Sequence, residues 1–160
     1  MKKSDWIKTV VLVTILLFLT LQKGSGFLLI LMLPLFLIYV LYHAVRMIRR
    51  PEERKNRGIR LAAWAITFAL AGAVQSYWST ASQKHADLVL TKVLAHKART
   101  GSYPTALSEV GVDEQYLKEK WRIRYWGKEG VPMLVYPATF MPLGLYEYDF
   151  EASRWRQNAY

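Results

Sequence analysis

Three stretches of the chain, residues 7–21, 27–45 and 61–78, are apolar and contain almost no ionisable side chains. The second and third approach the roughly 20 residues that cross a bilayer as a helix. The first is shorter, but Trp6 and Lys8 can extend it at one interface because their side chains combine an apolar body with a polar end. The pattern therefore predicts three transmembrane helices.

The first stretch has a rival interpretation, a cleaved signal peptide, because MKK precedes the apolar run. The residues that follow, LQKGSG, contain no small-x-small cleavage site, which favours an uncleaved helix. QKGSG is a tight, glycine-rich turn and predicts an antiparallel hairpin between the first two helices. Pro34 lies inside the second helix and is expected to kink it.

The third apolar stretch continues beyond its aromatic end, Tyr77 and Trp78, without proline or a second glycine as far as Thr100. Apolar side chains recur there at helical spacing: Ala86, Val89, Leu90, Val93 and Leu94. The pattern predicts one helix over 61–100, about 60 Å long at 1.5 Å per residue, half in lipid and half outside it. Lys97, Arg99 and a left-handed Gly101 are expected to end it.

Residues 101–160 have a different pattern. SYPTALSEVG predicts a turn, a short helix of about two turns with Pro104 at its first position, and an end at Gly111. A polar connector follows. WRIRYW, VPMLVYP, LYEYDF and RWRQ then have strand-like alternation, and GKEG predicts the turn between the first two. The expected fold class is α+β: an antiparallel meander with one face covered by the outer half of the long helix.

The distribution of charged residues predicts how the three helices are oriented in the membrane. The chain has 22 Lys and Arg against 12 Asp and Glu, and residues 1–78 hold 11 of the cations but only 3 of the acids. Seven cations lie between the second and third apolar stretches: Arg46, Arg49, Arg50, Arg54, Lys55, Arg57 and Arg60. The positive-inside rule places this loop and the N-terminus in the cytoplasm, and residues 101–160 in the periplasm of a bacterial inner membrane. We interpret the basic loop as a topology determinant that contacts lipid headgroups, rather than as a nucleic-acid site.

Three parts follow from these patterns: a hairpin with its basic loop over 1–60, the long helix over 61–100 and the periplasmic sheet domain over 101–160. Small residues lie four apart on one face of the long helix, at Ala65, Ala69 and Ala73. Such a face lets another helix approach closely, either from the hairpin or from a second copy of the chain.

The first half of the predicted long helix is embedded in the membrane and its second half covers a sheet. The string Arg99-x-Gly101-x-Tyr103-Pro104-x-x-Leu107 and a meander follow it. This arrangement resembles the type IV pilins and type II secretion pseudopilins. The resemblance covers about residues 61–160 and implies a pilin-like fold. Family members are cut before a Phe and carry a Glu at the fifth mature position. Gly26-Phe27 has the residues of such a cut site, but Leu31 occupies the fifth position.

Candidate chemistry is sparse. The chain has no cysteine, and no phosphate-binding loop, GxSxG or HExxH motif occurs. His85 and His96 share a helix face but lie about 16 Å apart along the axis, too far to bind one metal. Glu147, Asp149 and Glu151 have the spacing of one strand face, which is typical of a solvated face more often than of a metal site. We expect no enzyme activity, cofactor or metal.

Aromatic side chains are dense outside the predicted membrane region, with 12 Trp, Tyr or Phe among residues 101–160. The pattern leaves open which way Trp126, Tyr136, Phe140 and Trp155 face. Aromatic residues beside arginines are typical of binding patches, and the loop PATFMPLG is stiff and apolar. The candidate partner-binding residues are Arg122, Arg124, Trp126, Phe140, Met141, Glu147, Asp149 and Trp155.

These features favour a non-enzymatic membrane protein whose outer domain binds another protein. Small size and an aromatic outer domain favour an immunity protein that neutralises a toxin acting at the membrane or in the periplasm. The alternative is an accessory subunit of a pilus or secretion machine, as the fold resemblance implies. A small transporter that uses Pro34 and His43 is a third interpretation, although polar groups near the end of a span, such as His43 beside Tyr39, Tyr42 and Arg46, are ordinary.

Overall fold

The computed structural model describes residues 3–127 and 132–159. The fold is α+β, with three helices longer than 15 residues in the described chain and a four-stranded antiparallel sheet. The chain divides into two compact units, Met1–Ser76 and Tyr77–Tyr160, which we call the inner unit and the outer unit. The helix α3 (Arg54–Thr100) belongs to both.

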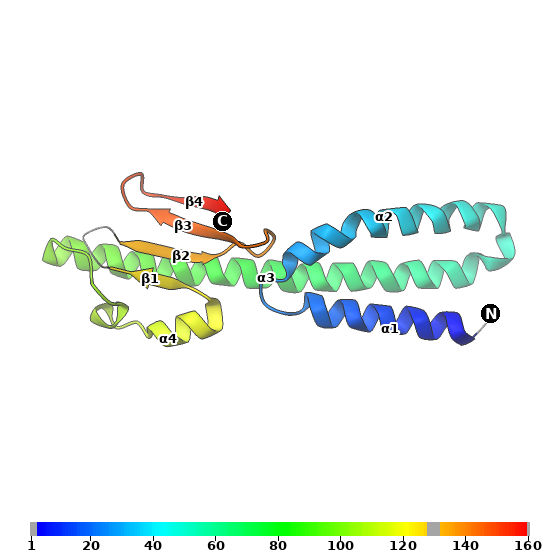
Figure 1. Cartoon of the computed structure of the whole chain (residues 1–160), viewed down its shortest axis with the longest axis horizontal. Helices are drawn as coiled ribbons and strands as arrows, with labels where there is room; N and C mark the ends of the chain where they lie inside the picture. The colour runs from blue at the N-terminus through cyan, green and yellow to red at the C-terminus, as the bar shows by residue number, and fades with distance from the viewer. Residues whose placement is uncertain (1–2, 128–131, 160) are drawn as a thin grey trace. The chain divides into compact units, whose positions relative to one another are not determined.

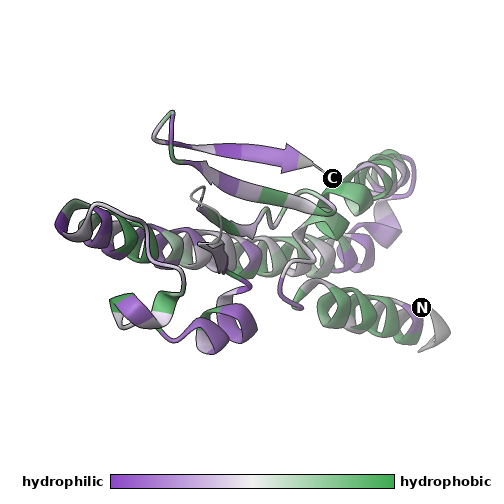
Figure 2. Cartoon of the chain, turned by 60° about the vertical axis from the view of Figure 1, so that its left-hand side comes forward, coloured by the Kyte–Doolittle hydropathy of each residue, from purple (hydrophilic) through white to green (hydrophobic). Residues whose placement is uncertain are grey.

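The inner unit contains α1 (Lys3–Thr20), α2 (Gly26–Arg49) and the first half of α3. The turn at residues 21–25, with Gly24 at a φ of +79°, reverses the chain, so α1 and α2 run antiparallel as predicted (Figure 1). Both helices are mostly hydrophobic (Figure 2). By length and composition, Gly26–Arg49 and the continuous Pro51–Thr100 could each cross a membrane, whereas the apolar helix Ile7–Thr20 is shorter.

Gln75 of α3 is fully buried and forms hydrogen bonds with the turn between α1 and α2. Its side-chain amide donates to the backbone carbonyl of Thr20, to that of Gln22 at 2.9 Å and to Oγ of Ser25 at 3.3 Å. Other polar side chains are buried nearby in this unit, including Thr67. The inner unit therefore buries several polar groups while many of its large apolar side chains lie on the outside.

Most of the predicted basic loop is helical. A short 3₁₀ turn, η1 (Pro51–Glu53), links α2 to α3, which begins at Arg54 and not at Leu61 as the apolar pattern indicated. Arg57 donates two hydrogen bonds to the Glu53 carboxylate, and Arg50 pairs with the same carboxylate at 3.3 Å. These pairs at helical spacing stabilise a first turn that carries many like charges.

The far end of α3 agrees with the sequence. The helix ends at Thr100, and Gly101 adopts a φ of +83° while its N–H donates to the Lys97 carbonyl at 2.8 Å. Lys97 and Arg99 lie in the last turn, where cations complement the helix dipole.

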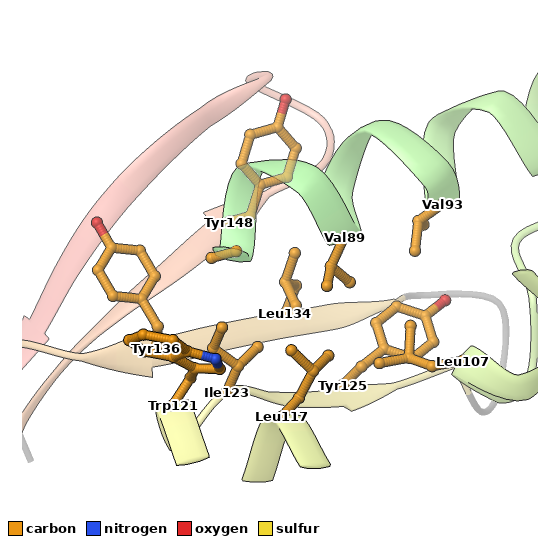
Figure 3. Packing of buried hydrophobic residues seen from close by; sticks show 11 residues of the cluster. Val89, Val93, Leu107, Leu117, Trp121, Ile123, Tyr125, Leu134, Tyr136 and Tyr148 are labelled. Atoms are coloured by element: carbon orange, nitrogen blue, oxygen red, sulfur yellow. The ribbon is translucent and has the colours of Figure 1, made fainter. Parts of the chain in front are cut away.

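The sheet of the outer unit has strand order β1–β2–β3–β4, with every neighbouring pair antiparallel. The strands are β1 (Arg124–Trp126), β2 (Met133–Pro137), β3 (Gly144–Asp149) and β4 (Arg154–Ala159). One sheet face packs on α3, and the shared core contains Val89 and Val93 from the helix and Leu134, Tyr136 and Tyr148 from the strands (Figure 3). The predicted meander over the helix is therefore present in the outer unit.

Two predictions for residues 104–126 are wrong in detail. The two-turn helix after Pro104 is a single 3₁₀ turn, η2 (Leu107–Val110). It begins after Ala106, where the Glu109 side chain accepts from the backbone N–H groups of Thr105 and Ala106, and it ends at the left-handed Gly111. The polar connector folds into a helical turn, α4 (Glu114–Tyr116), and a π turn, η3 (Leu117–Trp121), which shortens the first strand. Gly111 is left-handed as expected, and the GKEG turn lies largely outside the described residues.

Candidate partner-binding surfaces

The strand register separates the outer unit into a helix-facing side and an open side. On the open side Trp126 pairs with Met133, and Arg124 pairs with Val135. Val135 is in turn opposite Glu147, which pairs with Arg156 on β4. Trp126 is 44% exposed and Met133 is 37% exposed. We call Arg122, Arg124, Trp126, Met133, Glu147 and Arg156 the open face.

Arg122 and Arg124 have exposed side chains immediately before and within β1. Arg122 ends the π turn with a φ of 57°, a backbone conformation that few residues other than glycine adopt. The bend brings the chain from η3 into β1, so Ile123 and Tyr125 face the core while Arg124 and Trp126 face outward. The alternation read from WRIRYW is confirmed, although only Arg124–Trp126 is strand.

The acidic residues of β3 are paired within the sheet. Asp149 accepts a 2.6 Å ion pair from Arg156, and Glu147 accepts from Asn158 at 2.6 Å. Asp149 also accepts from the backbone N–H groups of Ala152 at 2.8 Å and Glu151 at 3.0 Å. The Ala152 N–H, followed by the Arg156 charge, holds the pKa of Asp149 below its ordinary value.

Glu151 does not share the strand face with Glu147 and Asp149, because β3 ends at Asp149 and the chain turns. Across the part of the chain that the structure describes, no group of three or more His, Cys, Asp or Glu could hold a metal ion. The carboxylates of β3 thus close a turn and link two strands.

Trp155 and Tyr136 face the helix. The indole N–H of Trp155 donates to the Asp87 carboxylate of α3 at 2.9 Å, and its ring lies 4.9 Å from that of Tyr136 and 5.2 Å from that of Tyr148. Burial raises the pKa of Tyr136. The structure therefore separates Trp155 from Trp126, which lies on the opposite side of the sheet.

Phe140 and Met141 lie in the loop of residues 138–143 between β2 and β3, which we call the 138–143 loop. Phe140 is 37% exposed, whereas Thr139 is buried. This loop follows the end of β2, while Trp126 pairs with Met133 at the beginning of that strand. The sequence-predicted patch therefore consists of two surfaces at opposite ends of the sheet.

The sequence did not single out Leu143, which has the most exposed large apolar side chain among the described residues of the outer unit. Leu143 is 82% exposed and has a φ of 57°. Its position after Pro142 and before Gly144 marks a turn, but no periodicity predicts a left-handed leucine.

The histidines occupy separate environments. His85 stacks on Trp121 with ring centroids 4.2 Å apart, and His96 lies 3.8 Å from the Glu109 carboxylate. His43 in α2 is buried, and its Nδ1 accepts from Arg57 at 3.1 Å. The histidines thus contact three different neighbours and do not converge on one point.

The small-residue stripe is not covered by the hairpin. Ala65, Ala69 and Ala73 are exposed, whereas Thr67, Ala71 and Gln75 are the buried residues of the inner half of α3.

Comparisons of this chain with family models, with curated proteins and with solved structures give no match.

Proposed function

We propose that the protein crosses a membrane three times, through α1, α2 and the inner half of α3, and holds its outer unit in the periplasm. The observation that carries this proposal is the burial pattern of the inner unit. Gln75, Thr67 and His43 are buried there, while leucines and isoleucines such as Ile66 and Leu70 are exposed. Water penalises that arrangement, whereas lipid solvates the exposed leucines and favours polar contacts between helices.

The cations support one orientation. The last turn of α2 contains Arg46 and Arg49, and the first turns of α3 contain Arg54, Lys55 and Arg57. The cationic side chains of both helices therefore lie at the same junction. Positive residues beside a span favour the cytoplasmic side and contact anionic headgroups. The exposed Ala65, Ala69 and Ala73 are available to a second copy of the chain within the membrane.

The outer unit, in this proposal, is a non-enzymatic protein-binding module that acts through the open face. Trp126 supplies an exposed aromatic anchor, Met133 extends it across the strand pair, and Arg122 and Arg124 flank it. Tryptophan and arginine dominate the energetics of protein interfaces. We favour a toxin as the partner, which makes the protein an immunity protein, because a small membrane-tethered binder suits a toxin acting at the membrane or in the periplasm.

An accessory subunit of a pilus or secretion machine is the second candidate. The observation that favours it is the uninterrupted α3, whose outer half lies under a meander of four strands, as in a pilin-like subunit. Both candidate functions require the same membrane-spanning helices, and they differ in the protein that the outer unit binds.

A photo-crosslinking amino acid at position 126 of the full chain, expressed in its native membrane, tests the proposal. We expect the crosslinking residue at position 126 to capture one protein, which mass spectrometry identifies. The same residue in place of the exposed Leu88 of α3 should capture none. A secreted toxin supports immunity, and pilus or secretion subunits support the accessory role. Equal labelling at both positions contradicts a binding role for the open face.

The Trp126→Ala variant gives the affinity arm of the same test. Truncation of an aromatic anchor weakens binding by about 1–3 kcal/mol, which is roughly a 5- to 150-fold rise in Kd. A matched truncation, Leu88→Ala, removes an exposed apolar side chain from another face of the outer unit and should leave the Kd unchanged.

A further inference from the structure

The 138–143 loop is a closed, apolar projection from the sheet. The Ala138 N–H donates to the Gly144 carbonyl at 2.9 Å, Met141 N–H to Ala138 at 3.1 Å and Gly144 N–H to Met141 at 3.2 Å. A side chain at Gly144 would meet the Met141 side chain at 2.8 Å, so the middle of the loop packs closely against the start of β3. The loop therefore holds its exposed Phe140 and Leu143 in a fixed frame.

Ser79 marks the level of the loop along α3. Ser79 lines a small hollow together with Ala138, Thr139, Phe140 and Met141. The other end of the sheet lies near the far end of α3, because the Tyr125 hydroxyl donates to the Pro104 carbonyl at 2.7 Å. Figure 1 shows the loop at the end of the sheet beside the first turns of the outer half of α3. The loop thus lies level with Tyr77 and Trp78, the aromatic pair that ends the proposed third span.

A second element lies at the same level. Trp121 of η3 packs against Trp78, with ring centroids 5.7 Å apart. Lys118 and Lys120 are exposed on that turn. Trp121 itself is buried in the core of the outer unit. The exposed lysines have long apolar stems and charged ends, which suit the boundary between membrane and water.

The amino-acid composition of the loop is consistent with a position at the boundary between membrane and water. Residues 132–146, which include β2, the loop and the first half of β3, contain no Asp, Glu, Lys, Arg or His, and neither do residues 61–83 of α3. The outer unit elsewhere has charged side chains on its exposed surface, as on β4 (Figure 2). An exposed leucine side chain is also less favourable in water than in an apolar environment.

We propose that the 138–143 loop inserts Phe140 and Leu143 into the periplasmic leaflet, at the boundary between headgroups and acyl chains, and so fixes the outer unit against the membrane surface. This inference rests on the proposed membrane crossing. The bilayer is the occupant because the loop is level with the end of the span that enters it. The open face, whose Trp126 lies at the other end of the sheet, stays free for a protein partner.

Single cysteines test the loop directly, since the chain has none of its own. Leu143→Cys, carrying a polarity-sensitive fluorophore, is reconstituted in the full chain in phosphatidylethanolamine–phosphatidylglycerol vesicles. The emission should shift to the blue and be quenched by phospholipids with a nitroxide near the glycerol backbone. Leu88→Cys, a comparably exposed leucine of α3 further from the proposed interface, should show neither effect.

Leu70→Cys separates this inference from the proposed crossing, because Leu70 is exposed within the third span. Quenching at Leu70 by nitroxides deep in the acyl chains, without quenching at Leu143, overturns the loop inference and leaves the crossing intact. Absence of quenching at Leu70 overturns both. A Leu143 probe that lies in water in bare vesicles, but is shielded when a captured partner is added, assigns the loop to protein binding and also overturns the inference.

Leu143→Gly distinguishes lipid contact from a structural role. Glycine suits the left-handed backbone at this position, so the variant should unfold at the same or a higher temperature than the parent chain. A probe at Phe140→Cys in the same variant should lose part of its quenching, because the neighbouring anchor is gone. A lower unfolding temperature with unchanged quenching identifies Leu143 as a structural residue only.

Discussion

The two halves of α3 have opposite burial patterns although they form one continuous helix. In the inner half, up to Ser76, the buried side chains include Thr67 and Gln75, and large apolar side chains such as Ile66 are exposed. In the outer half, Val89 and Val93 are buried and lysines such as Lys92 are exposed. The helix is therefore amphipathic in the ordinary sense in only one of its halves.

The difference shows why an apolar stripe alone does not identify the solvent around a helix. A helix in water must hide its apolar face, and the outer half does so beneath the sheet. A helix in lipid gains little from hiding leucine and more from pairing its polar groups with neighbours. We therefore expect the same kind of substitution to have opposite consequences in the two halves.

Val93→Asp should have the largest effect. Val93 is fully buried between α3 and the sheet, and a carboxylate there has no partner. An uncompensated buried charge costs about 3–5 kcal/mol. Tryptophan fluorescence of the full chain in detergent, followed through denaturant, should show early unfolding of the outer unit. The control is Lys92→Asp at the neighbouring residue, whose side chain is exposed. This variant should unfold at a denaturant concentration close to that of the parent chain.

Ile66→Asp should have the next largest effect and gives the sharpest test of the comparison. Ile66 in the inner half and Leu88 in the outer half are 59% and 62% exposed. A carboxylate near the centre of a span opposes insertion by about 2.5–3.5 kcal/mol, whereas an exposed substitution in water changes stability by about 0.5 kcal/mol or less. The measurement is the carbonate-resistant membrane fraction. Equal membrane fractions for Ile66→Asp and Leu88→Asp would contradict the proposed crossing.

Gln75→Leu should have a smaller effect, confined to the inner unit. The substitution removes the donor to the carbonyls of Thr20 and Gln22 and to Ser25. Hydrogen bonds between helices in a membrane contribute about 1–2 kcal/mol. Amide exchange at residues 21–25 should therefore accelerate by about 5- to 30-fold. Gln83→Leu, an exposed glutamine in the outer half, should leave that exchange unchanged.

The sequence predicted what depends on neighbours in the chain. The end of α3 follows from Gly101, and the phases of Ile123, Tyr125 and Tyr148 follow from strand alternation. Three helical segments and a meander of four strands were therefore expected, and the structure has them.

The sequence could not predict what depends on distant partners. Trp126 and Trp155 both occur in strands beside arginines, but only the register and the contact with Asp87 place Trp155 on the helix side. Gln75 reaches carbonyls more than 50 residues away. The turns of α4 and η3 replace a predicted connector because Asp113 caps one and Leu117 and Trp121 are buried by tertiary packing. Candidate surfaces are set by these long-range contacts, so they required the structure.

Acid should produce the smallest effect, and we follow it at Asp149 of the outer unit. The Ala152 N–H and Arg156 lower the pKa of Asp149, so this carboxylate stabilises the fold above its ordinary pKa of about 3.9 and loses that contribution as the pH falls through the lowered value. Asp149→Asn should make unfolding of the outer unit less dependent on pH below about 4, measured by denaturant titration at several pH values. Glu151→Gln, an exposed carboxylate in the same turn, is the control. Residues 61–78 contain no carboxylate, so the proposed third span should not respond over this range. A loss of α1–α2 structure at the same pH, rather than of sheet structure, would contradict the assignment of this transition to Asp149.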